Sequence, residues 1–386
     1  MLTLILYMIA DAGRRGYRPL LDAFWDECRT LRIDLGSEQP VSAAAFCIAR
    51  QKIPSEMILA LVHHAAQQFD LHFGDLFQVK GHRVFAVDGM KMQVTRSDDL
   101  FDALGWHASG YNPQMLVSTL YNVVSGVPHD LRVAPTHSSE RAELWAMLDS
   151  LREDDILTID RGYPAFDLTA ELLRRKVNFV VRLPASTFTG VKQFVADGGT
   201  DGWATICPPS RLRKTHTSIR VRVLAFPGKD LKPFVLMTDL EEVEFSWSEI
   251  EELYHLRWTV EEFYKIPKGD YLGQGQFHSK NFDGLKQEVY AFALFLSITR
   301  AFTAASADAV GVPYRHIYQK TAILAVADYL TRLFLEDSQH ELQSITTHLI
   351  SRIARTIVKP RPGRSYPRRS YRPRPPWTPK GKKGGK

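Results

Sequence analysis

The stretch from residue 154 to residue 184 constrains the fold of this chain more than any other. It contains a short apolar run, ILTI at 156–159, then a helical pattern, AFDLTAELLRRK, and then a second apolar run, VNFVVRLP. Two strands joined through a helix normally lie parallel in one sheet, because a tight turn cannot connect parallel neighbours. The stretch therefore predicts an α/β fold whose sheet contains a parallel pair.

Further strands are expected on both sides of this unit. HRVFAVDGMKMQV reads as an apolar strand that ends at Asp88 and Gly89 and is followed by a second extended run, and QMLVSTLYNVVSGVPHDLRVAP reads as two strands with a Ser-Gly turn. A helix is expected over residues 138–151, because its large apolar residues recur on one face. PFVLMTDL is another strand, and Ser246 with Glu249 then forms a capping box that starts a long helix.

These patterns divide the chain into five parts. Residues 1–79 and 301–358 are expected to be helical. Residues 80–183 and 234–300 are expected to form the α/β core. Between them, residues 184–233 are richer in Gly and Pro and include the alternating run TSIRVRVLAF, so we expect a β-rich insertion there.

The last part of the chain is strongly basic. Residues 359–386 hold eleven of the 49 Lys and Arg residues and no Asp or Glu, which leaves 38 basic against 43 acidic residues elsewhere. This Pro- and Gly-rich tail cannot bury a core, so it is predicted to be disordered alone and attracted to polyanions. Contact with nucleic acid and a solubilising role both stay open as interpretations.

Composition argues against several other classes of protein. A hydrophobic content of 45% over 386 residues fits a packed catalytic core with at least one smaller domain. The three cysteines are odd in number and far apart, so we expect no disulfide framework, no cysteine zinc site, and a reducing cytoplasm. The start, MLTLILYMIA, is too short to span a bilayer and is expected to be a buried helix or strand; no membrane segment is expected elsewhere.

A short helix near the N-terminus is a candidate DNA contact. PVSAAAFCIARQKIP offers Ser42 as a cap, Arg50 and Lys52 near the helix end, and Pro54 as a stop. A small basic helix can enter a DNA groove, but the same pattern suits a helix that only packs against the fold.

A polar stripe is expected on the long helix after residue 246. In YHLRWTVEEFYKIPK, residues 254–268, an α-helix would place Tyr254, Arg257, Glu261 and Lys268 within an arc of roughly 60°. The apolar residues of the same stretch fall on a separate arc. An aromatic ring, two cations and a carboxylate on one face suit a site that handles a phosphate chain.

Three carboxylates stand where a metal site is expected. Asp88 and Asp160 each end an apolar strand, and Glu261 lies on the polar stripe. Ligands gather beyond the carboxyl ends of strands in open α/β sheets, and a helix packed on the sheet can bring Glu261 there. Three oxygen donors suit Mg²⁺ or Mn²⁺, and two such ions about 4 Å apart can support phosphodiester chemistry. Taken singly, an Asp after a strand often only caps a turn; the combination favours the metal site.

These motifs resemble those of one known family. Tyr254, Arg257, Glu261 and Lys268, with two, three and six residues between them, are similar to the Y-R-E-K signature of DDE transposases of the insertion-sequence four group. That group belongs to bacterial cut-and-paste elements. VFAVDGMKM, and ILTIDRGYPAFDL followed by FVVRLP, resemble its other two motifs, so the resemblance covers about residues 80–300.

The resemblance implies a fold, a reaction and partners. The implied fold is a ribonuclease H-like core with a β-rich insertion, flanked by a helical N-terminal DNA-binding region and a helical C-terminal region. Asp88, Asp160 and Glu261 would bind two divalent ions, Mg²⁺ or Mn²⁺. The implied reaction is hydrolysis at the transposon end, often through a DNA hairpin, and strand transfer into target DNA. The protein would act on double-stranded DNA as a homodimer, in the bacterial cytoplasm.

The resemblance also implies DNA contacts near the cleaved end. Arg257 and Lys268 would hold phosphates, as bidentate and point-charge partners respectively, and Tyr254 would contact the DNA backbone. Pro267 precedes Lys268 and predicts that the helix ends or kinks there, so Lys265 on the same stripe is a second candidate.

Two further features are candidate DNA contacts. Hairpin-forming relatives hold a flipped base with a Trp, and Trp203, Trp247 and Trp258 are candidates, with core packing as the alternative for each. The Gly-rich loop GQGQFHSK, which includes residues 274–280, is a basic segment that follows the polar stripe.

Three rival functions stay open. A transposase-derived DNA-binding protein without catalysis is disfavoured, because all three carboxylates are present. A metal-dependent nuclease on the same fold would cut DNA without joining it, and both reactions use one metal site, so the sequence does not separate them. A structural protein with a nucleic-acid-binding tail would leave the polar stripe as coincidence.

Overall fold

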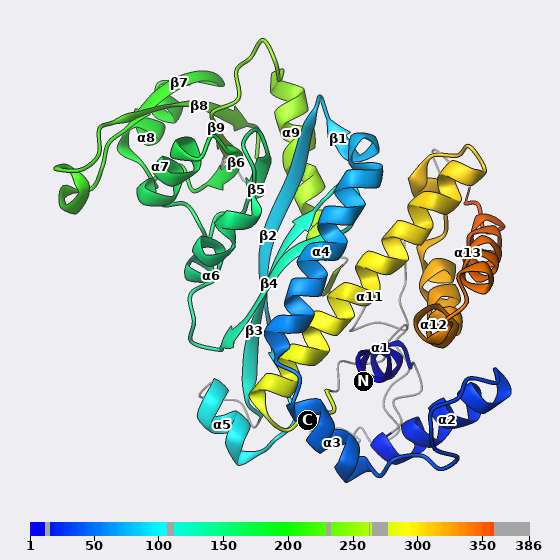
Figure 1. The fold of residues 1–386 in the computed structure, drawn as a ribbon. Coiled ribbons are helices and arrows are strands. Elements are labelled where there is room, and N and C mark those ends of the chain that lie inside the picture. Colours follow the sequence, from blue (N-terminus) through cyan, green and yellow to red (C-terminus); the bar gives the residue numbers. More distant parts are fainter. Residues whose placement is uncertain (12–15, 106–111, 229–232, 262, 265–276, 359–386) are drawn as a thin grey trace, which may run out of the picture.

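The protein folds into a mixed α/β structure with one large sheet and helices on both of its faces (Figure 1). The computed structural model describes residues 1–11, 16–105, 112–228, 233–261, 263–264 and 277–358. The α-helices among these residues are α1 (Leu2–Ala10), α2 (Tyr17–Thr30), α3 (Ala43–Gln51), α4 (Ser55–Phe73), α5 (Asp98–Leu104), α6 (Glu140–Met147), α7 (Phe166–Arg174), α8 (Thr189–Ala196), α9 (Trp247–Leu256), α11 (Phe282–Ala309), α12 (Gln319–Leu335) and α13 (Gln339–Ala354). The strands are β1 (Gln78–Val79), β2 (His82–Gln93), β3 (Gln114–Asn122), β4 (Pro128–Pro135), β5 (Ile156–Ile159), β6 (Asn178–Leu183), β7 (Asp201–Ile206), β8 (Ile219–Phe226) and β9 (Phe234–Thr238).

The strand order of the sheet is β4-β3-β2-β5-β6-β9-β8-β7, with β1 beside β2. Strand β2 pairs antiparallel with β3 and parallel with β5, and β5 pairs parallel with β6. The parallel pair predicted from the strand, helix and strand of residues 154–184 is therefore confirmed, with α7 as the connecting helix.

The segment 184–233 contains the expected strands, but it does not form a sheet of its own. Its strands β7 and β8 continue the main sheet through β9, which pairs antiparallel with β6. The segment also contains helix α8, which the sequence pattern did not predict. Strand β9, which follows this segment in the chain, pairs with β6 on one side and with β8 on the other. The strands of the segment therefore extend the main sheet beyond β9.

Apolar side chains pack on both faces of the sheet. In β2, Phe85 and Val87 face α6 and α7, whereas Val84 and Ala86 face the side of α4, α9 and α11. A strand covered on both faces needs a continuous apolar run instead of an alternating one, which explains the sequence VFAV. Helices α4 and α11 lie side by side across the second face (Figure 1).

The N-terminal region shares this core. The apolar start of the chain forms helix α1, in which Ile5 and Leu6 are fully buried, so the expectation of a buried element is confirmed. Ile58 and Val62 of α4 belong to the same cluster of buried residues as the sheet. Other N-terminal residues, among them Phe24, Trp25 and Phe46, form a smaller buried cluster of their own.

Arg50 of helix α3 takes part in the interior. Its side chain is 4% exposed, forms an ion pair of 3.0 Å with Glu288, and donates to Gln287 and to the carbonyl of Gly284 on α11. The packing interpretation therefore holds for Arg50, which is not available to a DNA groove in this structure. Lys52, at the end of the same helix, is exposed.

Helix α11 is long and apolar enough to cross a membrane, judged by length and composition only. Most of its side chains are buried inside the protein, and they include Gln287, Glu288 and Arg300. A core helix passes the same test, so this helix is a weak indication of a membrane segment.

The helix that carries the polar stripe is interrupted, which corrects the expectation of one continuous α-helix. Helix α9 begins with the predicted capping box, in which the Ser246 backbone N–H donates to Glu249 over 2.9 Å. The helix ends at Leu256, and residues 257–259 form a 3₁₀ turn before helix resumes at residue 260. Each 3₁₀ residue turns about 120° instead of about 100°, so the stripe does not keep a single arc.

Thr259 gives a physical reason for the interruption. Its hydroxyl lies 2.8 Å from the carbonyl oxygen of Leu256 and 3.2 Å from that of Val123, close enough to donate to either. A side-chain hydroxyl that bonds to a preceding carbonyl competes with the backbone hydrogen bond of a regular helix.

Candidate active site

Asp88 lies within β2, opposite Thr119 of β3, and the strand continues beyond it to Gln93. The expectation that Asp88 ends its strand is therefore wrong. Side chains alternate along a strand, so Asp88 faces the same side of the sheet as Ala86, the side that α4 and α11 cover. The side chain is half-buried, and the apolar run that precedes it is fully buried.

Asp160 follows the last residue of β5, as predicted, and contacts helix α9. The Tyr254 hydroxyl donates to Asp160 Oδ1 over 3.1 Å. Tyr254 is 1% exposed, and burial, with the charge of Asp160, raises its pKa to about 12. Tyr254 is therefore a neutral donor that holds one carboxylate oxygen of Asp160, and its hydroxyl points into the protein.

Arg257 lies in the 3₁₀ turn and is also buried, with 4% of its surface exposed. Its guanidinium carbon lies 5.6 Å from the ring centre of Tyr254 and 5.1 Å from that of Trp258. Among the described residues, its Nε atom has no hydrogen-bond partner. A buried donor of this kind is costly unless an acceptor occupies the space beside it.

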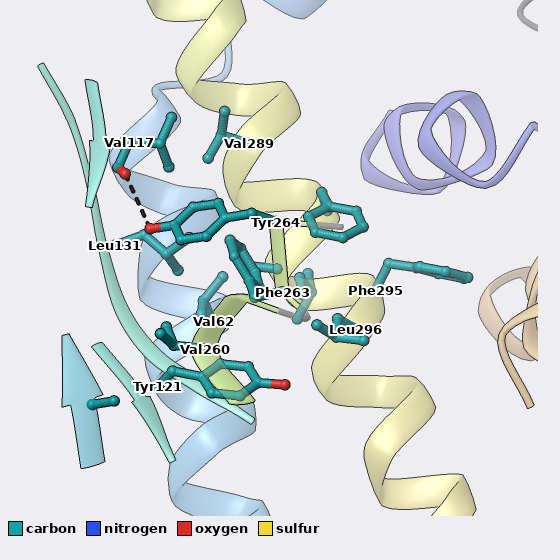
Figure 2. Packing of buried hydrophobic residues seen from close by; sticks show 14 of the residues in the cluster. Val62, Val117, Tyr121, Leu131, Val260, Phe263, Tyr264, Val289, Phe295 and Leu296 are labelled. Carbon is teal, nitrogen blue, oxygen red and sulfur yellow. Dashed lines mark hydrogen bonds between the residues drawn. The ribbon is translucent and has the colours of Figure 1, made fainter. Parts of the chain in front are cut away.

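Tyr264 fixes the helical turn that carries Glu261 to the sheet. Its hydroxyl lies 2.7 Å from the carbonyl oxygen of Asp88 and 3.1 Å from that of Val117, and can donate to either. Figure 2 shows the Tyr264 ring beside Phe263, with its hydroxyl directed at Val117. Because Glu261 lies three residues before Tyr264 in helical backbone, this bond sets the place of Glu261 relative to β2.

The electrostatic environment of Asp88 connects these elements. Burial is the main cause that raises the pKa of Asp88 to about 6, and the charges of Glu140 and Glu261 raise it further. The Arg257 guanidinium and the Gly89 N–H act in the opposite direction. The structure therefore places Asp88, Glu261 and Arg257 close enough to influence one another, although they come from separate elements.

Glu140, the first residue of α6, packs directly over the strand beside Asp88. A Cβ atom built on Gly89 would lie 2.7 Å from Glu140 Cγ unless the Glu140 side chain shifted. Glu140 is also near the buried Tyr163, and burial together with Glu140 raises the pKa of that phenol. A larger residue at position 89 would therefore force the Glu140 side chain to move away from the strand.

A cavity of about 710 Å³ contains two arginines among its lining residues, Arg182 and Arg161, the residue that follows Asp160. The Arg182 guanidinium carbon lies 5.1 Å from the ring centre of Phe234, and that ring contacts Tyr254 edge-on at 5.4 Å. The cavity thus combines positive charge with an aromatic surface, and its Phe234 ring contacts the tyrosine that binds Asp160.

The site offers suitable donors for a divalent ion but no finished cage. Within the described part of the chain, no group of three or more His, Cys, Asp or Glu side chains is arranged to hold a metal ion. Carboxylate oxygens are nevertheless the ligands that Mg²⁺ prefers, and a cation would relieve the repulsion between Asp88 and the two glutamates near it. In donor chemistry, Asp88, Asp160 and Glu261 fit such an ion.

Comparison with known families identifies the class of this protein. A family model described as transposase DDE domain matches residues 79–298. The chain belongs to the DDE transposase family. The match supports DNA transposase activity, because enzymes of this family are nucleases and transposases.

Other comparisons add little to this assignment. A solved structure of piggyBac transposase in a synaptic complex with hairpin DNA is similar, with 12% identity and a TM-score of 0.48, over 90% of this chain and 74% of that chain. At that TM-score the likeness carries no further argument. No curated protein matches the chain.

The structure of this DDE transposase brings together part of the predicted site. Asp88, Glu261 and Arg257 interact electrostatically, and Asp160 contacts Tyr254. Lys265 and Lys268 lie outside the described residues, as do Glu262 and residues 274–276 of the Gly-rich loop.

The three candidate tryptophans have different surroundings. Trp247 packs against Phe226 with ring centres 4.1 Å apart, which is the core-packing alternative. Trp258 is 51% exposed, so core packing does not describe it. The Trp203 ring lies beneath the Arg220 guanidinium, 4.4 Å from its centre.

Sequence reasoning missed several residues of this transposase site. Tyr264 belongs to the stretch 254–268, but the sequence pattern predicts no role for it. The sequence places Glu140 in a helix, and Arg161 and Arg182 in the strand motifs, without indicating a function for any of them. The signal that was available for the arginines is their position, since each one follows or ends a strand of the parallel pair.

Proposed function

We propose that this protein is an active DNA transposase of the insertion-sequence four group. It would bind the terminal inverted repeats of its element and catalyse metal-dependent cleavage and strand transfer. The strand order β4-β3-β2-β5-β6, with three antiparallel strands followed by a parallel pair, supports a ribonuclease H-like core for this chemistry.

The observation that carries the proposal is the environment of Arg257. This guanidinium is buried, has an Nε without a partner among the described residues, and lies near Asp88. A phosphate oxygen is the acceptor that such a donor recognises best, since charge-assisted bonds from Arg to phosphate are strong and directional. The site therefore suits a phosphodiester at the junction of β2, β5 and the 3₁₀ turn.

Each residue of the site has a proposed role. Asp88, Asp160 and Glu261 would hold two Mg²⁺ or Mn²⁺ ions, which when bound supply activation of a water or 3′-hydroxyl and stabilisation of the leaving oxygen. Arg257 would bind the phosphate at the cleaved bond. Tyr254 would orient Asp160 through its hydrogen bond, which replaces the direct DNA contact that the resemblance implied.

The remaining DNA contacts are proposed from charge. Lys265 and Lys268 are further phosphate contacts. The cavity with Arg161 and Arg182 would take the nucleotide next to the cleaved phosphate, since it combines positive charge with the Phe234 ring. We further propose a homodimer that pairs two transposon ends on double-stranded DNA in the bacterial cytoplasm.

The test uses the full chain and a plasmid that carries the DNA flanking the gene on both sides. Asp88→Asn, Asp160→Asn and Glu261→Gln should each abolish Mg²⁺-dependent cleavage while binding to the same DNA persists. Asp239→Asn is the matched control, because burial also raises the pKa of Asp239 to about 6 but this residue lies outside the site. Cleavage retained in any one of the three site variants would overturn the carboxylate assignment.

The same reactions separate a transposase from a nuclease. Products in which the excised end is joined to target DNA indicate strand transfer, whereas free ends alone indicate a nuclease. A wild-type protein that neither cleaves nor joins, but still binds DNA, would point to a DNA-binding derivative.

A further inference from the structure

The edge of the sheet formed by β7 and β8 has one buried face and one face that becomes exposed toward the strand ends. Ala204 and Val221 belong to the core under α7 and α8. On the opposite face, Arg222 is 1% exposed and its two outer nitrogens and Nε are bound by Asp201 and by the Phe245 carbonyl. Two residues further out along the same face, Arg220 is exposed.

The connection between these strands, residues 207–218, is basic and we call it the β7–β8 loop. Residues 202–228 contain five Lys or Arg residues and no Asp or Glu. Arg213 and Lys214 of the loop are exposed, like Arg220. Within the described part of the chain none of these three side chains forms an ion pair, whereas Arg222 pairs with Asp201.

Exposed cations without ion pairs also occur elsewhere in the described residues, but here three of them lie on one hairpin in which residues 202–228 hold no Asp or Glu. At the far end of α7, the exposed Arg174 and Lys176 and the half-buried Arg175 all pair with carboxylates, at 2.5 to 2.7 Å. Outside the basic tail the chain has more acidic than basic residues. This hairpin therefore gathers three exposed cations that no carboxylate of the described residues neutralises, which makes it a candidate site for an external polyanion.

Two contacts hold the β7–β8 loop in place. Arg211 forms an ion pair of 3.3 Å with Asp167, and the His216 ring contacts Phe166 edge-on at 6.0 Å. Both partners belong to the first turn of α7, which begins six residues after Asp160. The loop is thus tied to the segment that carries a site carboxylate, and Figure 1 shows β7 and β8 at the end of the sheet beside α7 and α8.

Arg220 is also prepared for binding. Its guanidinium carbon lies 4.4 Å from the centre of the Trp203 ring, which neighbours it across the strand pair. Stacking on an aromatic face restricts the side chain while leaving its N–H groups free to donate in the plane of the guanidinium. Less conformational entropy is then lost when a phosphate binds.

We propose that Arg213, Lys214 and Arg220 form a second DNA-binding surface of this transposase, which holds the phosphate backbone of DNA outside the cleavage site. The inference rests on the proposed function, because it takes the anion to be the DNA that reaches Asp160. The three cations would contact up to three phosphates without reading the bases.

The test compares the salt dependence of duplex DNA binding in the full chain and in two triple variants. Arg213→Gln with Lys214→Gln and Arg220→Gln removes the proposed contacts. Arg174→Gln with Arg175→Gln and Lys176→Gln removes the same charge from paired cations, and is the matched control. Each lost phosphate contact lowers the slope of log affinity against log salt by about 0.9, so the first variant should lose about 3 and the control less than about 1.

The difference in slope has a direct consequence for affinity. Between 50 and 200 mM salt, the wild type should lose about 40-fold more affinity than the loop variant does. Equal slope changes in the two triple variants would overturn the inference. The double change Arg213→Gln with Lys214→Gln, which leaves the stacked Arg220 intact, should lower the slope by about 2 and guards against a folding defect.

Two further measurements separate the inference from the proposed function. Cleavage at saturating DNA should be unchanged in the loop variant, because its residues do not contact the site carboxylates. If the wild type cleaves DNA but the loop variant binds DNA with an unchanged salt slope, the second DNA-binding surface is refuted and the proposed function stands. Polyglutamate and single-stranded RNA are tested as competitors of duplex DNA. If either binds as well as duplex DNA does, and binds only when the β7–β8 loop is intact, the surface belongs to another polyanion and the proposal is overturned.

Discussion

Replacing Asp88 by Asn should stabilise the metal-free protein at neutral and alkaline pH. In the folded protein, burial and the neighbouring glutamates raise the pKa of Asp88 from 3.8 to about 6. The unfolded chain therefore releases this proton at lower pH than the folded protein does. The folded state loses stability as the pH rises from about 4 to about 6, and the loss is complete above that window.

The pKa shift sets the size of the effect. A shift of about two units corresponds to about 3 kcal/mol at 1.36 kcal/mol per unit, which is an upper value because Asp88 is only half-buried and water screens its charge. With about 2.1 cal/mol/K of unfolding entropy per residue, 3 kcal/mol in a cooperative chain of 386 residues raises the melting temperature by about 4 °C.

Thermal unfolding of three proteins tests this reasoning. Wild type, Asp88→Asn and Asp239→Asn are compared below and above the window, each with and without Mg²⁺. The Asp88 variant should melt higher than the wild type only at the higher pH. Mg²⁺ should raise the melting temperature of the wild type and of Asp239→Asn, but not of Asp88→Asn. In the wild type the Asp239 carboxylate accepts the Phe179 N–H away from the site.

Two results would refute the argument. If Asp88→Asn melts no higher than the wild type above the window, the ionised Asp88 carboxylate does not cost the metal-free fold any stability. If Mg²⁺ raises the melting temperature of Asp88→Asn as much as that of the wild type, the ion binds elsewhere.

Three other changes have defined outcomes. Tyr254→Phe removes only the hydrogen bond to Asp160, so the free energy of unfolding should change by about 1 kcal/mol. The cleavage rate at saturating DNA should fall while DNA affinity stays the same, and an unchanged rate would contradict the orienting role. Gly89→Ala should destabilise the protein, because its Cβ meets Glu140 Cγ at 2.7 Å. In a double-mutant cycle followed by urea unfolding, Glu140→Ala should remove most of this loss of unfolding free energy, and an equal loss in both backgrounds would exclude the clash. Deletion of residues 359–386 should weaken DNA binding and flatten its salt dependence, and an unchanged slope would leave the tail a solubilising terminus.

The parts of the fold that local pattern determines could be predicted from the sequence. The parallel pair β5 and β6 follows from two apolar runs separated by one helix, and the capping box at Ser246 is a contact within four residues. The interruption of the helix after Leu256 was not predictable in this way. It coincides with a bond from Thr259 to the carbonyl of Val123, which is 136 residues away in the chain.

The same distinction applies to the site. Asp160 was placed correctly, because the end of a buried strand is visible in the sequence. Tyr254 was assigned to the correct helix but to the wrong environment, since periodicity indicates which residues share a face and not what covers it. Glu140 was missed because its proximity to Gly89 depends on how α6 packs on β2, which no spacing in the sequence encodes.

The hydrogen bonds of the other buried arginines in this fold support the proposal that Arg257 binds an anion. The described residues include five buried arginines, which are Arg50, Arg83, Arg222, Arg257 and Arg300. Four of them donate hydrogen bonds to carboxylates, amides or carbonyls inside the protein. Arg257 instead contacts two aromatic rings and makes no hydrogen bond within the described part of the chain. Because a buried donor without an acceptor is costly, the Nε of Arg257 is better satisfied when an added acceptor, such as the phosphate oxygen proposed above, lies beside it.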